Sequence, residues 1–180
     1  MRGLIRAIDA MNEGIGRFVS WFALLLVLVQ FAVVVMRYVF GISVLAMQES
    51  VWYMHSTIFL VAAGYTLRHD GHVRIDILYG HVGPRGKALI DLIGVFVILL
   101  PMCTLTWWVA WPYVANAWAV KEGSVEVSGI QAVYLLKTAL LVFAGSLATQ
   151  GVSLAAKAIL TLNGSTSFYG APAEPEEHAL

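Results

Sequence analysis

Long apolar runs separated by short polar stretches dominate the pattern of this chain. A helix that crosses the hydrocarbon core of a bilayer needs about 20 predominantly apolar residues. Four runs suit such a crossing and occupy residues 18–40, 49–67, 88–111 and 130–160. The pattern predicts an all-α integral membrane protein, with residues 1–162 forming one domain of four transmembrane helices.

Two of the runs carry features that predict their shape. Pro101 lies within the third run and removes one helical hydrogen bond, so we expect a kink there. The fourth run is about 45 Å long as a helix and must therefore tilt or project from the membrane. Small residues recur along it, and we expect them to pack closely against another helix of the same chain. They are Ala144, Ala148, Gly151 and Ala155.

The most polar connection follows the second run and reads RHDGHVRID over residues 68–76. Such a density of charge belongs in water or among lipid headgroups. The aliphatic and aromatic residues of 76–84 predict a short segment lying in the membrane interface before the third helix. Gly, Ser, Pro and Glu become frequent near the C-terminus, which predicts a disordered tail over residues 163–180.

The distribution of Lys and Arg predicts the orientation, because short connections rich in these residues stay in the cytoplasm. One side of the membrane would carry Arg2, Arg6, Arg17, Arg68, Arg74, Arg85, Lys87 and Lys157. The other side would carry only Lys121. We therefore expect both termini in the cytoplasm, and we expect the first run to be retained as an anchor, since it is longer than the core of a cleaved signal peptide.

Composition agrees with a membrane protein, since 59% of the residues are apolar and only 12% are charged. The mean hydropathy is +0.78. The formal net charge is zero, so no basic surface favours binding to nucleic acid. The one cysteine, Cys103, lies inside the third run and has no partner for a disulfide within the chain.

Three charged residues lie toward one end of their predicted helices, where charges usually require partners. Arg37 ends the first run and Glu49 opens the second after Gln48, so the two charges are candidates for a pair. Lys137 can extend toward Glu122 or Glu126. A second membrane protein and the surrounding water are the alternative partners. In the third run, Asp91 follows Lys87 at the spacing of an ion pair within one helix.

The sequence contains no recognisable grouping of catalytic residues. We find no Ser/His/Asp or Cys/His grouping, no glycine-rich phosphate loop and no paired metal ligands, so we expect no enzyme, cofactor or metal site. A haem-carrying anchor of a respiratory enzyme would need histidines on facing helices, but only His55 lies within a run. That alternative and a freestanding membrane bundle both remain open at this stage.

Several short motifs together carry a resemblance to a known family. They are Gln48-Glu49, the stretch from Tyr65 to Arg68, Gly71-His72-Val73-Arg74-Ile75-Asp76, and Ile90-Asp91 with Gly94 and Pro101. Over residues 15–160 the chain resembles the small membrane subunit, the Q-type or DctQ-like subunit, of a tripartite ATP-independent periplasmic (TRAP) transporter.

The resemblance implies a small permease subunit of the bacterial inner membrane. Its partners would be membrane lipids, a large membrane subunit that holds the substrate and sodium sites, and a periplasmic protein that delivers the substrate. The implied function is to scaffold the large subunit and to help dock the binding protein during sodium-coupled uptake of an organic acid. Arg37, Gln48, Glu49 and Lys137 would then be docking or structural residues.

The resemblance also implies that residues 71–76 form a structural clasp at the inner interface of the membrane. In this hypothesis Gly71 permits a turn that is followed by His72, while Arg74 and Asp76 anchor the backbone between lipid headgroups and the third helix. The plain alternative is a solvated charged loop without a structural role.

Overall fold

The computed structural model describes residues 1–72, 79, 82–164 and 168–169. These residues form four helical rods and contain no strand, which confirms the predicted all-α fold. The first rod is α1 (Arg2–Val39) and the last is α7 (Val133–Leu162). Between them lie two rods, each interrupted by one π-helical segment.

The second rod consists of α2 (Leu45–Ser56), the π-helix η1 (Thr57–Val61) and α3 (Ala63–Arg68). The third rod consists of α5 (Pro84–Gly94), the π-helix η2 (Val95–Leu99) and α6 (Leu100–Ala119). Pro101 is the second residue of α6, just after η2, and the wider turn relieves the clash between the proline ring and the carbonyl four residues earlier. The expected irregularity therefore occurs just before the proline.

Two helices extend far beyond the ranges predicted from the apolar runs, while the other boundaries differ from the prediction by at most four residues. We expected the first helix to begin at residue 18, but α1 begins at Arg2 because its early turns bury Ile5, Asn12 and Gly16. We expected the third helix to end at residue 111, but α6 continues through Pro112 to Ala119. Val114 and Ala117 lie buried in this extension, so packing outweighs the hydrogen bond lost at the proline.

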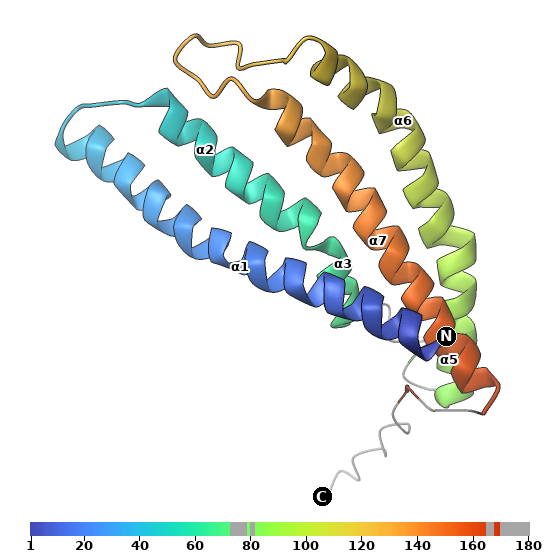
Figure 1. Cartoon of the computed structure of the whole chain (residues 1–180). Coiled ribbons are helices and arrows are strands. Elements are labelled where there is room, and N and C mark those ends of the chain that lie inside the picture. Colours follow the sequence, from blue (N-terminus) through green and yellow to red (C-terminus); the bar gives the residue numbers. More distant parts are fainter. Residues whose placement is uncertain (73–78, 80–81, 165–167, 170–180) are drawn as a thin grey trace, which may run out of the picture.

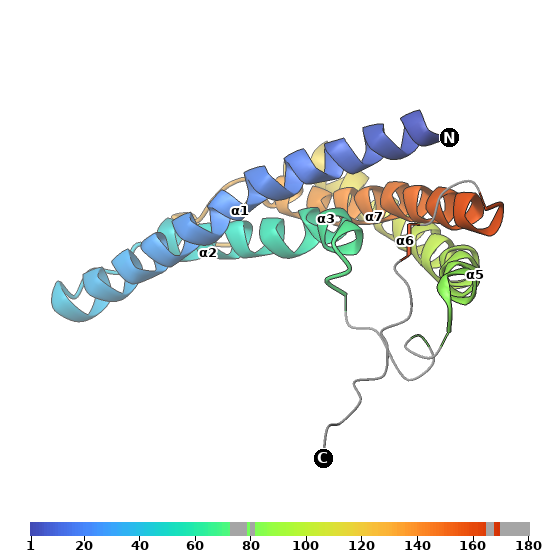
Figure 2. The same cartoon turned by 90° about the horizontal axis from the view of Figure 1, so that it is seen from below.

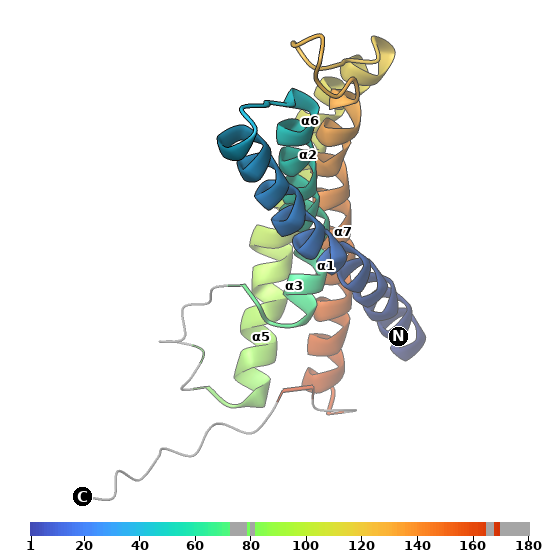
Figure 3. The same ribbon diagram turned by 90° about the vertical axis from the view of Figure 1, so that its left-hand side faces the viewer.

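The four rods run obliquely side by side (Figure 1), with α7 lying between α2 and α6. The view from below shows α1 on one side of the layer formed by α2, α7 and α6 (Figure 2). Figure 3 shows α1 crossing this layer at an angle. We call the end with the α1–α2 and α6–α7 connections the hairpin end, and the opposite end, where α1 begins and α7 finishes, the terminal end.

Helix α7 is the centre of the packing and contacts all three other rods. Its small residues make this possible, since Ala144 and Ala155 are buried and a Cβ on Gly151 would lie 2.2 Å from Leu99 Cδ2 of η2. The predicted small-residue face therefore meets helices of the same chain. Cys103 and Leu147 pack with Ala63 in the apolar core of this region.

Three helical stretches are long and apolar enough to cross a membrane: α1, the continuous stretch Pro84–Ala119, and α7. The second rod runs from Leu45 to Arg68 but is divided by η1 and by the break at Ala62, so no single helix in it reaches that length. The segment expected in the interface between the second and third helices, and the tail expected over residues 163–180, lie mostly outside the described residues.

Candidate functional site

A polar cluster at the terminal end joins α1 to α7. Lys157 Nζ lies 2.7 Å from Asp9 Oδ2. The other oxygen of the Asp9 carboxylate, Oδ1, accepts hydrogen bonds from Gln150 Nε2 at 3.0 Å and from Ser153 Oγ at 2.8 Å. Gln150, Ser153 and Lys157 are spaced three and four residues apart, so they share one face of α7. One carboxylate of α1 is therefore held by three side chains of α7.

The hydrogen bonds of this cluster also orient two amide groups. An ionised Asp9 only accepts, so Gln150 must turn its NH₂ toward Asp9 and its Oε1 toward Asn12 Nδ2, which donates at 2.8 Å. Asn12 Oδ1 then faces Gly64 of α3 and is buried without a hydrogen-bond donor in the described chain. A Cβ on Gly64 would lie 2.6 Å from this oxygen and 2.9 Å from the Ser146 carbonyl oxygen. Glycine is thus required where α1, α3 and α7 meet.

Glu13 connects the same end of α1 to the end of α3. Its Oε2 lies 2.7 Å from Arg68 Nη1 and 2.8 Å from His69 Nε2, while its Oε1 lies 3.0 Å from Arg17 Nε. The hydrogen bond from His69, with further contributions from Arg17 and Arg68, lowers the pKa of Glu13 below its ordinary value of 4.5. The Glu13 carboxylate is therefore a charged junction between two helices at neutral pH.

Burial and hydrogen bonding act on the pKa of Asp9 in opposite directions. Burial raises the pKa of this carboxyl, but the hydrogen bonds from Lys157, Gln150 and Ser153 outweigh burial, so the pKa lies below its ordinary value of 3.8. Asp9 precedes the apolar run of α1, so the cluster lies toward one membrane surface. It is ionised and fully paired at neutral pH.

At the hairpin end, Glu49 of α2 holds the connection between α6 and α7. Its side chain is only 8% exposed, and it accepts hydrogen bonds from Ser124 Oγ at 2.5 Å and from the Ile130 backbone N–H at 2.6 Å. A Cβ on Gly129 would lie 2.6 Å from Glu49 Oε1, so glycine leaves room for the carboxylate. The Glu49 carboxylate therefore holds the α6–α7 connection by hydrogen bonds alone, since it forms no ion pair with any described residue.

A second contact at the hairpin end involves Lys137 of α7. Its Nζ lies 2.5 Å from Glu122 Oε2 and 4.0 Å from the centroid of the Tyr113 ring. The expected extension of Lys137 toward Glu122 is therefore present. Lys121 adopts a left-handed backbone conformation, with φ 50°, just after α6, and its Nζ lies 4.4 Å from the Trp118 ring centroid.

The structure separates the other two residues expected near this end. Glu49 does not pair with Arg37, because its oxygens face the α6–α7 connection instead. Arg37 is exposed and forms no ion pair with any residue that the structure describes. Gln48 donates from Nε2 to Ser43 Oγ at 2.9 Å, within the α1–α2 connection. Of the expected docking residues, Arg37 alone projects from the bundle without a described partner.

The proposed clasp at residues 71–76 is described only in its first part. Asp70, with φ 54°, is the left-handed residue of the turn, and Gly71 instead donates its N–H to the Thr66 carbonyl at 2.9 Å. The Asp70 N–H also donates to the Leu67 carbonyl. Together these two hydrogen bonds form a Schellman motif that ends α3. His72 is exposed, while Arg74 and Asp76 lie outside the described residues.

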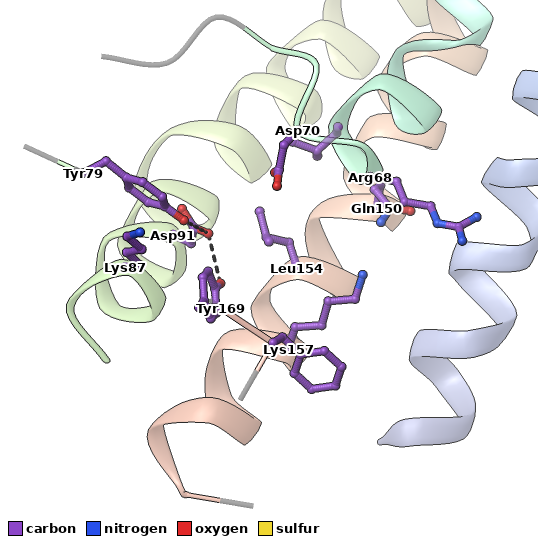
Figure 4. A pocket seen from close by; sticks show the side chains of 11 residues that line it. Arg68, Asp70, Tyr79, Lys87, Asp91, Gln150, Leu154, Lys157 and Tyr169 are labelled. Carbon is purple, nitrogen blue, oxygen red and sulfur yellow. Dashed lines mark hydrogen bonds between the residues drawn. The ribbon is translucent and has the colours of Figure 1, made fainter. Parts of the chain in front are cut away.

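A polar cavity of about 320 Å³ lies at the terminal end beside α3, α5 and α7 (Figure 4). Asp91 of α5 accepts hydrogen bonds there from Tyr169 Oη at 2.9 Å and from Tyr79 Oη at 3.1 Å. The predicted ion pair between Lys87 and Asp91 is not formed in the described part of the chain. Lys87 Nζ instead lies over the Tyr79 ring, 5.4 Å from the ring centroid. Tyr79, which precedes α5 in the chain, and Tyr169, which follows α7, thus both bond to α5.

The described histidines do not form a haem site. His55 is exposed and stacks on Phe59, with 4.6 Å between ring centroids, whereas His69 is bound to Glu13. His69 and His72 follow the end of the rod that contains His55, and even His69 is about 20 Å from His55 at 1.5 Å per residue, too far to ligate one iron with it. Among the described residues, no group of three or more His, Cys, Asp or Glu side chains is arranged to hold a metal ion.

The apolar runs did not indicate most of the terminal-end cluster, because its residues lie either before residue 18, where the first run begins, or inside the fourth run. The missed residues are Asp9, Asn12, Glu13, Gln150 and Ser153. A helical spacing was available as a signal, since Asp9, Asn12, Glu13 and Gly16 recur every three or four residues. This spacing lies before the continuously apolar run that predicts the first helix.

Comparison with the curated proteins and with the solved structures gives no significant match. A family profile, described as the DctQ component of tripartite ATP-independent periplasmic transporters, matches residues 26–161. This match covers most of the chain and confirms the resemblance stated from the sequence motifs. The profile describes a component of transporters and not of enzymes, as we expected. The chain therefore belongs to the DctQ family and is a multi-pass small membrane subunit of a TRAP transporter.

Proposed function

We propose that this subunit is the fixed scaffold on which the large transport subunit is mounted in the bacterial inner membrane. It also helps to dock a periplasmic substrate-binding protein for sodium-coupled uptake of an organic acid. Both termini lie in the cytoplasm in this proposal. The large subunit, the binding protein and membrane lipids are its partners.

The contrast in burial between α1 and α7 is the observation that carries the scaffold role. In the most apolar 18-residue window of each helix, 56% of α7 is buried within the chain but only 6% of α1. A helix that is apolar all round and uncovered by its own chain faces lipid or another membrane protein. In our proposal that second protein is the large membrane subunit, and membership of the DctQ family supports this choice.

The interior of the bundle favours a scaffold over a transport path. Transporters that bind a substrate near the bilayer midplane place several polar groups there. Here the main buried and half-buried polar side chains pair within the chain: Asp9, Asn12 and Gln150 bond to each other between α1 and α7, and Glu49 bonds to the α6–α7 connection. The apolar contact of Ala63, Cys103 and Leu147 adjoins the first of these groups. The substrate and sodium sites therefore belong to the large subunit.

The connection between α6 and α7, residues 120–132, is our candidate for contact with the binding protein. Val125 and Val127 are essentially fully exposed on it, at 101% and 98%. Glu49 and Ser124 hold this connection in place, and Figure 3 shows it beyond the ends of α2 and α7, level with the last turns of α6. Apolar side chains held in such a position suit a protein partner in the aqueous space outside the membrane.

The cations at the terminal end support the proposed orientation. Arg17, Arg68 and Lys157 lie there, beside Asp9 and Glu13. Reporter fusions at His69 and Lys121 test the assignment: cytoplasmic activity at His69 and periplasmic activity at Lys121 are expected. The reverse pattern would place the candidate docking connection in the cytoplasm and contradict our proposal.

Reconstitution tests the function directly. The tagged chain is co-expressed with the large subunit and purified in mild detergent, and an absorbance spectrum is recorded on the same sample. A colourless complex is then placed in liposomes with the binding protein, and uptake of labelled organic acids is measured with and without an inward sodium gradient. Uptake that needs the gradient and all three components is expected, whereas a Soret band or full uptake without this chain would refute the proposal.

A further inference from the structure

A mainly apolar groove of about 510 Å³ runs between α1 and the η1–α3 part of the second rod. Gly16, Val19 and Ala23 line it from α1, and Phe59 lines it from η1. These α1 residues recur at three- and four-residue spacing and so share one face of the helix. The groove is therefore a shallow channel between two membrane helices, and we asked what lies along its continuation toward the hairpin end.

On the α1 wall, the continuation leads to Gln30. This residue is seven positions after Ala23, which returns it to the same face of the helix. Gln30 is exposed, lies near the middle of the apolar run 18–40, and makes no side-chain hydrogen bond to the described part of the chain. An amide facing hydrocarbon without a hydrogen-bonding partner is unfavourable. Its position therefore calls for a polar group from outside the chain.

On the opposite wall, the continuation leads to His55. This residue precedes Phe59 by one helical turn and stacks on its ring at a centroid distance of 4.6 Å. His55 is also exposed and has no ion pair or hydrogen bond with the described residues. Gly16 of α1 and Tyr65 of α3 are in close contact and mark one common depth of the two helices. Measured along each helix from that contact, Gln30 and His55 reach depths that differ by about one helical turn.

The chemistry of these two side chains selects the occupant of the groove. A lipid acyl chain can fill the apolar part, but it cannot accept or donate a hydrogen bond at the depth of Gln30 and His55. A transmembrane helix that carries a polar side chain at that depth can do both. Arg37 lies seven residues beyond Gln30 on the same face of α1 and is also exposed, so this face offers a further polar contact near the membrane surface.

We propose that the α1–η1 groove, with Gln30 and His55 at its continuation, seats a transmembrane helix of the large subunit that bears a hydrogen-bonding side chain at mid-membrane depth. This inference rests on the proposed scaffold function and assigns the face by which the two membrane subunits meet. Small residues along the groove permit close approach, and the two polar side chains fix the depth of the incoming helix.

Site-specific photo-crosslinking on the intact complex tests the assignment. A benzophenone amino acid is placed at Ala23 in the groove or, as the matched control, at Trp21, which is exposed and lies about 200° around α1 from Ala23. The full chain is co-expressed with the large subunit, irradiated in membranes and purified. An adduct with the large subunit from position 23, and none from position 21, is the expected result.

Three outcomes with an intact complex would overturn this inference: an adduct from position 21 alone, adducts only between two copies of this chain, or adducts only with lipid. Each of them leaves the proposed scaffold function standing. If the unmodified chain co-purifies with no large subunit at all, the scaffold function itself fails, and the assignment of its interface fails with it. The two failures are thus distinguished by the unmodified sample.

Substitutions test the polar contacts separately from the groove. Gln30→Leu and His55→Phe are each expected to lower the affinity of the small subunit for the large one about threefold, as is typical of one hydrogen bond between membrane helices. Phenylalanine at position 55 retains an aromatic ring to stack on Phe59. Leu28→Ala, on the other side of α1 from Gln30, should leave the affinity unchanged. Wild-type affinity in the Gln30→Leu, His55→Phe double variant would overturn the proposed polar contacts.

Discussion

The two ends of the bundle are held together by different chemistry. At the terminal end, Asp9 and Glu13 of α1 meet Arg68, His69 and Lys157 from the second rod and α7, so charges of both signs connect three rods. At the hairpin end, Glu49 is held by one hydroxyl and one backbone N–H, both from the α6–α7 connection. Charge pairs join three rods at the terminal end, whereas at the hairpin end the Glu49 carboxylate and the Lys137–Glu122 pair both involve the connection between α6 and α7.

This difference separates two tasks within one small subunit. The terminal-end cluster joins residues that lie up to 148 positions apart in the chain, so it sets how α1 crosses α7. The Glu49 contacts set only the path of the chain between α6 and α7. Damage to the first should loosen the whole bundle, whereas damage to the second should free a surface connection. The predictions below test that separation.

Removal of Asp9 should have the largest effect. In Asp9→Leu, Lys157, Gln150 and Ser153 all lose their acceptor, and we expect a loss of about 3 kcal/mol in the free energy of unfolding. Asp9→Asn retains an acceptor and should lose less. Thermal unfolding of the purified chain in detergent, followed by circular dichroism, measures both. A wild-type unfolding midpoint in Asp9→Leu would show that the cluster does not hold the bundle together.

Gly64→Ala should disrupt the same end by sterics. The added Cβ would meet Asn12 Oδ1 at 2.6 Å and the Ser146 carbonyl oxygen at 2.9 Å, so α3 must move away from α1 and α7. We expect a loss of about 2 kcal/mol. The matched control is Gly14→Ala, where an added Cβ meets nothing within 4 Å and the better helix propensity should leave stability equal or slightly higher. Equal unfolding midpoints for the two variants would contradict this account.

At the hairpin end, Glu49→Ala should cost about 1–2 kcal/mol, because the Ile130 N–H and the Ser124 hydroxyl lose their acceptor. The more informative readout is hydrogen exchange, measured by mass spectrometry. Exchange should rise over residues 120–132 while it stays unchanged at the terminal end. Ser124→Ala removes one of the two contacts and should produce a smaller rise. Faster exchange across α1 in Glu49→Ala would show that the two ends are not independent.

The Lys137–Glu122 pair should contribute least to stability. Its glutamate side chain is 37% exposed, and partly exposed ion pairs are worth about 0.5 kcal/mol. Lys137→Met should therefore shift the unfolding midpoint only slightly, and Glu122→Gln should behave similarly. A loss as large as that of Asp9→Leu would place a main support of the bundle at the hairpin end.

Mild acidification should produce the smallest change. The folded-state pKa values of Asp9 and Glu13 lie below their ordinary values of 3.8 and 4.5. Their contribution to stability is thus complete above these ordinary values and is lost as the pH falls through the lower folded-state values. Unfolding midpoints should not change through these groups between pH 7 and pH 5 and should fall below about pH 4. Asp9→Asn should weaken this acid dependence.

Several features of the fold followed from local patterns. Four apolar runs predicted four membrane rods, and the small residues of α7 predicted close packing within the chain. The ends of the helices were less predictable. Whether residues before 18 or after 111 continue a helix depends on the burial of Ile5 and Ala117 against other rods. The hydropathy of a short stretch of sequence does not reveal such burial.

The candidate site shows the same limit. Arg37, Glu49 and Lys137 stood out because charges near apolar runs are conspicuous, yet Glu49 is bound to Ile130 and Ser124 rather than to Arg37. Asp9 and Glu13 did not stand out, because acidic residues in a polar tail look ordinary. Their importance arises only when α1 crosses α3 and α7, which brings Arg68 and Lys157 to them.

The sequence by itself determined that this chain is a four-rod membrane protein of the DctQ family, because hydropathy and short motifs are properties of neighbouring residues. Only the tertiary structure decided which charges meet, where glycine is indispensable and which faces stay uncovered. The physical reason is that an ion pair, a close helix contact or an exposed mid-membrane amide depends on distances between segments far apart in the chain. Gln30 shows this most clearly. In the sequence it is one polar residue in an apolar run, and only the packing of the helices shows that its face of α1 is uncovered.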